Sequence, residues 1–237
     1  TRYVDTEIPH IPVVAKGLKD EGYATVSTTN WLPYSWSINN VAFAEVMHTS
    51  LAYWQAGRNE EAFKLLKSSV LDGMYLGSSP GNFGQVSFYD AARGECYRDF
   101  GDPIGVASRA LVQGLFGVLP DAMNGRVLVR PGFPSAWDHA SISTPDIDFA
   151  FKRTNNIETY NVELKFEKQL ALELQVRAHS DKIKSVKVNG KDAKWSFVES
   201  ATGYPIMKIS SPSAKKNKIE IVWGENKLAK SPEVVSV

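Results

Sequence analysis

Apolar positions in the first half of the chain recur at helical spacing. Between 38 and 55 they occupy so many faces that we predict a helix buried on more than one side, and Gly57 ends this pattern. A second such segment, at 59–76, predicts a helix that folds back on the first. Pro103 suits the first turn of a third helix, expected to end near Phe116, whose small side chains would let neighbouring helices pack close. The pattern therefore predicts a helical hairpin followed by one further helix.

Apolar and polar positions alternate in the second half of the chain, as they do in β-strands with one buried face. Asn189 and Gly190 form the dipeptide most typical of a two-residue hairpin turn. Short strands separated by turns are typical of an antiparallel β-sandwich. The expected strands are 147–152, 159–166, 170–177, 183–188, 206–209 and 218–223. We therefore predict an α+β protein with two domains, the helices over 1–135 and the sandwich over 136–237.

Composition limits the partners and cofactors to be expected. The 237 residues carry a formal net charge of +1, too small to attract nucleic acid or an anionic membrane. No apolar run reaches the roughly 20 residues that cross a bilayer. Cys96 is the only cysteine, so neither an intrachain disulfide nor a multi-cysteine metal site is expected. None of the four histidines has a second histidine at helical metal spacing, so no metal site is expected either.

The junction between the two halves carries a family resemblance. Segment 97–145 combines an acidic loop, one apolar helix and a passage into strands marked by glycine and proline. In particular, GLFGVLPDAMNGRVLVRPGFP followed by WDHASISTPDIDFAFKR resembles the end of a bacterial (α/α)6 six-hairpin glycoside hydrolase, in the company of the α-L-rhamnosidase-like enzymes and related Bacteroidetes-type glycosidases. The resemblance implies the last helices of a toroid followed by its C-terminal β-sandwich.

The predicted helices are too few to close a ring of six helical hairpins. Buried helices without neighbours would leave a large apolar surface bare, which soluble proteins rarely tolerate. The resemblance therefore implies that the remaining toroid helices, from the parent chain or from a second copy, are partners of this segment.

The loop before the first helix is rich in aromatic and amide side chains. Trp31, Tyr34 and Trp36 lie in TTNWLPYSWSINN, at 28–40. Aromatic faces suit sugar rings, and amides or hydroxyls suit sugar oxygens, so we predict a carbohydrate subsite here. The alternative is that these aromatic side chains pack between helix ends.

A second loop, at 94–102, places three carboxylates around an arginine. Glycosidic cleavage ordinarily uses one carboxyl group to protonate the leaving oxygen and another to activate water or attack the sugar. The resemblance implies that Glu95, Asp99 or Asp102 is the base, and that Arg98 contacts substrate or keeps a neighbouring carboxylate ionised. The alternatives are structural: Asp102 precedes Pro103 as a helix cap, and Asp99 pairs with Arg98.

Two functions from different classes follow from these features. The first is the C-terminal portion of a glycoside hydrolase acting on a polysaccharide or oligosaccharide, contributing one wall of the active site and the base carboxylate. By resemblance such an enzyme needs no organic cofactor and works in the periplasm or outside the cell, and the present chain alone is expected to be inactive. The second is a non-catalytic module that binds carbohydrate or buttresses the helices.

Overall fold

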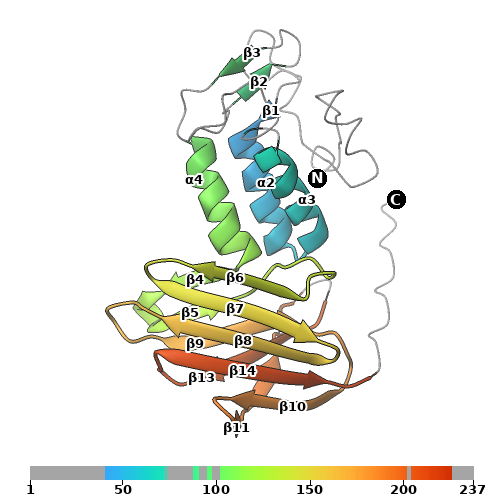
Figure 1. Ribbon diagram of the computed structural model, residues 1–237, viewed down its shortest axis with the longest axis vertical. Coiled ribbons are helices and arrows are strands. Elements are labelled where there is room, and N and C mark those ends of the chain that lie inside the picture. The colour runs from blue at the N-terminus through green and yellow to red at the C-terminus, as the bar shows by residue number, and fades with distance from the viewer. Residues whose placement is uncertain are drawn as a thin grey trace. The chain divides into compact units, whose positions relative to one another are not determined.

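The computed structural model describes residues 41–71, 73, 88–90, 95–97, 102–201 and 204–225 (Figure 1). The chain divides into two compact units, Thr1–Leu115 and Phe116–Val237. No helix among the described residues is both long and apolar enough to cross a membrane. The α+β organisation predicted from the sequence, helices first and sheets second, is confirmed.

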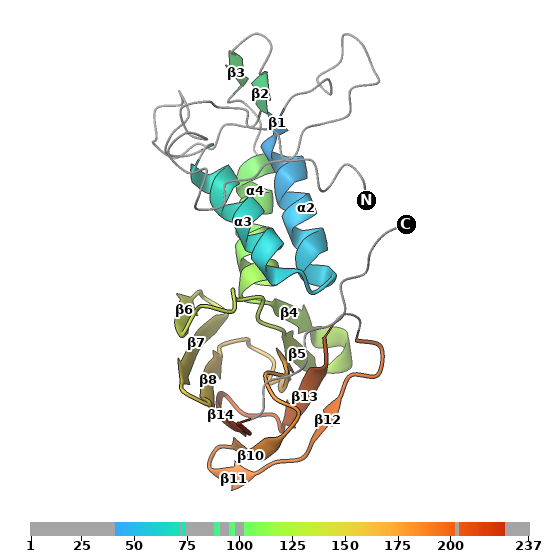
Figure 2. The same ribbon diagram turned by 90° about the vertical axis from the view of Figure 1, so that its right-hand side faces the viewer.

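The first unit is built on the predicted helical hairpin. Helix α2 (Phe43–Gln55) is followed by α3 (Asn59–Val70), and Gly57 turns the chain between them with a φ of 76°. This left-handed conformation is one that glycine adopts without steric cost, which explains why the helix ends there. The buried Ser50 hydroxyl donates to the carbonyl of Ala62 at 2.6 Å and joins the two helices. Figure 2 shows the two helices side by side.

Helix α2 buries one broad face, so the prediction of burial on more than one side is wrong. Its buried residues, which include Val46, Met47 and Trp54, recur at spacings of three and four and form a single stripe, while the opposite side, with Glu45 and His48, is exposed. The third helix, α4 (Asp102–Arg109), continues as the π-helical turn η2 (Ala110–Leu115). At Gly114 an added Cβ would lie 2.2 Å from Cε3 of Trp54, so only glycine permits this approach. The expected close packing against a small side chain is thus present at Gly114.

The second unit is a two-layer β-sandwich (Figure 2). One layer is an antiparallel six-stranded sheet in the order β11-β10-β14-β8-β7-β6. Its strands are β6 (His139–Ser143), β7 (Ile147–Thr154), β8 (Ile157–Leu164), β10 (Ile183–Val188), β11 (Lys191–Asp192) and β14 (Lys216–Trp223). The other is a five-stranded sheet in the order β12-β13-β9-β5-β4. Its strands are β4 (Val118–Asp121), β5 (Arg126–Val129), β9 (Ala171–Arg177), β12 (Trp195–Phe197) and β13 (Ile206–Ser211).

The five-stranded sheet departs from the prediction in two ways. Strand β5 pairs parallel with β9, so this layer is mixed rather than wholly antiparallel. In addition, the hairpin β4–β5, joined by the 3₁₀ turn η3 (Ala122–Asn124), belongs to the sandwich. Val127 and Val129 are fully buried there, and the units divide between Leu115 and Phe116 rather than after 135. The reason is that these short strands bury their apolar side in the sandwich core.

The sandwich core at this end is aromatic. Phe133 contacts Phe116 edge-on at 5.3 Å between ring centroids and stacks on Phe151 at 5.2 Å. Trp137 stacks on the same ring at 6.0 Å. The irregular segment between β5 and β6 is therefore fastened to the sandwich by ring packing.

Candidate functional site

The acidic segment predicted to hold the catalytic base lies partly in a small antiparallel sheet of the first unit. This sheet has the order β1-β2-β3, with β1 (Val41–Ala42), β2 (Phe88–Asp90) and β3 (Glu95–Tyr97). Glu95 begins β3, directly opposite Asp90 in the register. Opposed residues of an antiparallel pair are neighbours, so two carboxyl-bearing residues share one register position. Asp90 is a site residue that the sequence alone did not indicate, although the signal, an acidic residue directly after the aromatic pair Phe88 and Tyr89, is present there.

Of the remaining predicted site residues, only Asp102 lies within the described part of the chain. Asp102 is the first residue of α4, the end of the helix at which capping is its alternative role. Its side chain, like those of the β1–β3 sheet, is not described. The other predicted residues lie outside the described residues: Trp31, Tyr34, Trp36, Arg98 and Asp99. Their roles stay predictions.

The described part of the chain has a hollow of its own on the outer face of the six-stranded sheet. Its volume is about 610 Å³, within the range of small-molecule sites. The outward side chains form two rows that cross four strands, β6, β7, β8 and β14. One row is Ser143, Asp148, Glu163 and Lys216, and the other is Ser141, Ala150, Asn161 and Lys218. Sequence alternation predicted the outward face, but the rows depend on the register between strands.

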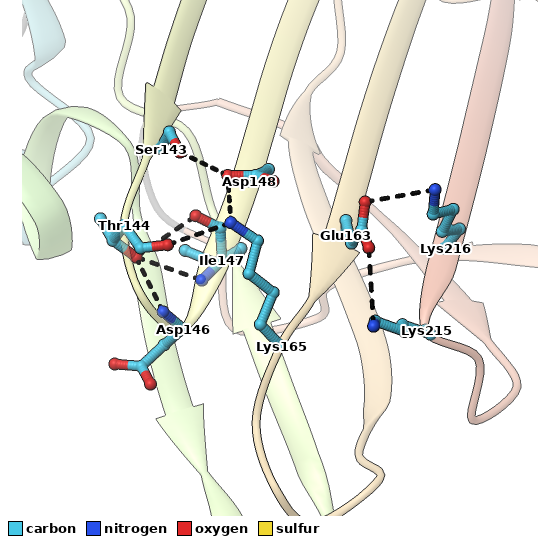
Figure 3. Close-up of polar contacts among 9 residues, drawn as sticks. All are labelled: Ser143, Thr144, Asp146, Ile147, Asp148, Glu163, Lys165, Lys215 and Lys216. Carbon is cyan, nitrogen blue, oxygen red and sulfur yellow. Dashed lines mark hydrogen bonds and ion pairs between the residues drawn. The ribbon is translucent and has the colours of Figure 1, made fainter.

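The first row is satisfied by its own contacts (Figure 3). Asp148 accepts hydrogen bonds from the Ser143 hydroxyl and from Nζ of Lys165, both at 2.6 Å. These two contacts, that of Lys165 first, lower the pKa of Asp148 below its usual value. Oε2 of Glu163 lies 3.5 Å from Nζ of Lys216, and Oε1 lies 3.9 Å from Nζ of Lys215. Both carboxylates of this row are therefore paired with lysine side chains.

A tight turn next to the first row explains why Asp148 and Lys165 meet. The Thr144 hydroxyl accepts hydrogen bonds from the backbone N–H groups of Asp146 and Ile147, and it holds the β6–β7 connection in place (Figure 3). Lys165 donates to the Thr144 carbonyl at 3.3 Å as well as to Asp148. The lysine is thus fixed across the end of the sheet.

The second row is open to a ligand. The Ser141 hydroxyl, the Asn161 amide and the Lys218 ammonium group make no side-chain contact with any other described residue. Ala150, between Ser141 and Asn161 in the register, leaves room above the sheet. Hydroxyl, amide and ammonium groups are the hydrogen-bonding partners that sugar hydroxyls and carboxylates require. The row is suited to binding a polar ligand by hydrogen bonds.

A separate carboxylate lies inside the sandwich. Glu158 of β8, whose side chain is 1% exposed, accepts hydrogen bonds from Nε of Arg153 at 2.8 Å and from the Tyr160 hydroxyl at 2.9 Å. Nε2 of His179 lies 3.2 Å from it. Burial would raise the pKa of Glu158, but the contacts with His179 and Arg153 outweigh burial and lower it to about 2. Burial, and then the charge of Glu158, raise the pKa of Tyr160 well above its usual value. Such a network stabilises a core and offers no free acid or base.

The described residues contain no group of three or more histidine, cysteine or acidic side chains placed to hold a metal ion.

Comparison with known proteins gives structural matches only. No family model and no curated protein matches the chain. It is similar to the α-L-rhamnosidase from Dictyoglumus thermophilum, with a TM-score of 0.48 and 11% identity over 81% of this chain and 22% of the enzyme. It is also similar to the Streptomyces avermitilis α-L-rhamnosidase complexed with L-rhamnose, with a TM-score of 0.41 and 12% identity over 78% of this chain and 18% of the enzyme. The similarity to the Gracilariopsis lemaneiformis α-1,4-glucan lyase has a TM-score of 0.32, with 15% identity over 41% of this chain and 13% of the lyase. The chain spans less than a quarter of each protein.

Proposed function

We propose that this chain is the C-terminal portion of a glycoside hydrolase acting on a polysaccharide or oligosaccharide. It contributes one wall of the active site and the base carboxylate, and it works in the periplasm or outside the cell. Two features support the proposal: the family resemblance carried by the sequences at 114–134 and 137–153, and the order of elements that this resemblance implied, helices leading into a sandwich.

The observation that carries the proposal is the β2–β3 hairpin. It sets Glu95 opposite Asp90 in the register, and β1, which pairs with β2, runs directly into α2. Glycosidic hydrolysis ordinarily requires two carboxyl groups that lie close together. Asp90 therefore joins Glu95, Asp99 and Asp102 as a candidate for the catalytic base, and Arg98 remains a candidate for substrate contact.

The helices support the proposed partner. Ile104 of α4 and Leu111 of η2 are among the large apolar side chains that are exposed in this chain. They are seven positions apart, two helical turns, and so belong to a similar face. We propose that the remaining toroid helices of the parent chain cover them.

Kinetics on the longest expressible parent polypeptide tests the proposal. We expect Glu95→Gln, Asp99→Asn, Asp102→Asn or Asp90→Asn to lower kcat by about 10² to 10⁴ for one member of the set, as loss of a general base does. Glu199→Gln, which changes an exposed carboxylate of the sandwich, is the matched control and should leave kcat unchanged. Full activity in all four variants would refute the assignment of the base to this region.

A second function is favoured by the outer-face hollow. Its open row, Ser141, Asn161 and Lys218, suits a carbohydrate-binding module that does no chemistry. Titrating the chain with oligosaccharides tests this alternative, because binding without hydrolysis in the parent polypeptide would favour it over the enzyme.

A further inference from the structure

Two exposed aromatic rings lie on the edge strand of the five-stranded sheet. Trp195 is 40% exposed and Phe197 is 46% exposed, with ring centroids 5.4 Å apart and an angle of 78° between the rings. They oppose Ile209 and Met207 of β13, which are fully buried, so the aromatic pair continues the core face out to the open edge of the sandwich.

A second hollow adjoins this aromatic edge. It has a volume of about 590 Å³ and lies between the β10–β11 hairpin of one sheet and strands β12 and β13 of the other. Trp195 borders it together with four charged residues, Lys191, Asp192, Lys194 and Lys208. None of these lysines forms an ion pair within the described residues. The hollow therefore combines an aromatic surface with an excess of unpaired positive charge.

Asn189 connects the two hollows, because it borders both of them. It is held rigidly: its side-chain oxygen accepts the N–H of Lys218 at 2.8 Å, and its own N–H donates to the Lys218 carbonyl at 2.8 Å. Its φ of 50° and that of Gly190, 80°, are those of the tight turn between β10 and β11. The Asn189-Gly190 turn thus lies between the hollow beside Trp195 and the hollow that contains Lys218.

We propose that these two hollows form one extended binding site for an oligosaccharide that carries carboxylate groups. One sugar ring stacks on Trp195, the chain crosses Asn189, and further sugars bind to Asn161 and Lys218. The inference rests on the proposed function for the class of ligand, but the site itself is outside the proposed catalytic region. Aromatic rings bind the C–H face of a sugar, and the lysines bind its carboxylates.

The charges favour an acidic sugar over a neutral one. Three lysines and one aspartate border the hollow that Trp195 adjoins. In the other hollow Lys216 and Lys218 balance Asp148 and Glu163. Beside it Lys165 and Lys215 outnumber one further carboxylate, that of Asp146. The whole path is thus positively charged, although the chain as a whole is nearly neutral.

Calorimetric titration of the full chain tests the proposal. The probes are two uronate series, alginate and galacturonate oligosaccharides from disaccharide to octasaccharide, with malto-oligosaccharides of equal length as the neutral series. We expect at least one uronate series to bind, more tightly with length until both hollows are filled, and more weakly at high salt. If neither uronate series binds the folded protein, or if the neutral series binds as well, the proposal is overturned.

Variants locate the binding. Trp195→Ala should weaken binding of the longer oligosaccharides about tenfold, and Lys218→Met should weaken it several-fold. Met123→Ala removes an apolar side chain that is 99% exposed and serves as the control, with no effect expected. Both changed side chains are exposed, and an unchanged near-UV circular dichroism spectrum will show that the variants fold. Equal binding by the Trp195 variant overturns the proposal.

Two further outcomes separate this inference from the proposed function. Binding of a single-stranded oligonucleotide with the same dependence on Trp195 would overturn the assignment to a sugar. Uronate binding by this chain, together with an inactive parent polypeptide, would uphold the extended site while refuting the hydrolase.

Discussion

Arg153 donates from Nε to Oε1 of Glu158 at 2.8 Å across the β7–β8 hairpin, although only 1% of the glutamate side chain is exposed. The two residues are directly opposed in the strand register. The same guanidinium donates from Nη1 to the carbonyl groups of Ser135 and Trp137. This ion pair therefore does more than neutralise charge in the core, because it also attaches the segment before β6 to the sandwich.

Removing one member of this pair should destabilise the sandwich strongly. Glu158→Gln keeps the shape of the buried side chain but leaves Arg153, which is 23% exposed, without its counter-charge. We expect the free energy of unfolding to fall by about 3–5 kcal/mol. Urea unfolding at neutral pH, with amide exchange in β8 as a local probe, measures this change. Glu199→Gln, on the surface, is the control, and an equally small effect of both substitutions would contradict the role of the pair.

The same pair makes stability depend on pH. The pKa of Glu158 falls from an ordinary 4.5 to about 2 on folding. A carboxyl group whose pKa is lowered on folding stabilises the protein above its unfolded pKa, and this contribution disappears as the pH falls through the folded value. Here it amounts to about 3 kcal/mol, present above pH 5 or so and lost towards pH 2. As the pH falls from 5 to 2, the difference in unfolding free energy between the natural protein and Glu158→Gln should narrow by about 3 kcal/mol. A difference that stays constant over this pH range would contradict the low pKa of Glu158.

Lys165 should control the ionisation of Asp148 on the outer face. The lysine is the first cause of the low pKa of Asp148, and the Ser143 hydroxyl is the second. In Lys165→Met the pKa of Asp148 is expected to rise towards its ordinary value, as followed by carboxyl-carbon NMR during a pH titration. Lys191→Met, which changes an exposed lysine of β11, should leave the pKa of Asp148 where it was. No rise in the first variant would show that the contact at 2.6 Å is not maintained in solution.

Local patterns predicted much of the fold. The strand predicted at 183–188 is β10, and the Asn189-Gly190 turn lies where expected, because both depend on neighbouring residues alone. Gly57 ends α2 for the same kind of reason. These features require only a backbone conformation that the residue itself favours.

Contacts between distant segments could not be predicted in the same way. Val127 and Val129 form a short β-branched run that fits a linker as well as a strand, and only the parallel pairing with Leu172 and Leu174 of β9 makes it a central strand. The outer-face hollow depends likewise on the register of four strands, and the aromatic edge depends on Trp195 lying on the last strand of its sheet. No local pattern contains this information.

Two glycines with the same backbone conformation should respond differently to alanine. Gly117 and Gly125 have φ angles of 66° and 68°, so alanine meets a similar strain at both, about 1–2 kcal/mol. At Gly117, however, a Cβ would lie 1.8 Å from the carbonyl oxygen of Arg130, whereas at Gly125 it meets nothing within 4 Å. We expect Gly117→Ala to lower the free energy of unfolding by clearly more than Gly125→Ala does, as measured by urea unfolding. Equal losses would show that β4 and the segment after β5 are further apart than described.

A second pair of glycines tests the packing of the helices, with opposite signs expected. Gly105 lies in α4 with open space around the position of a Cβ, so Gly105→Ala should raise helix stability by about 1 kcal/mol. At Gly114 the added methyl group would meet the ring of Trp54, which is 6% exposed and has little room to move. Gly114→Ala should therefore lower the unfolding free energy by roughly 1–3 kcal/mol, the usual cost of overpacking. Thermal unfolding measures both changes, and the near-UV circular dichroism of the natural and variant proteins reports on the tryptophan. If the Gly114 variant is as stable as the Gly105 variant, α2 and η2 do not approach each other closely enough for glycine to be required.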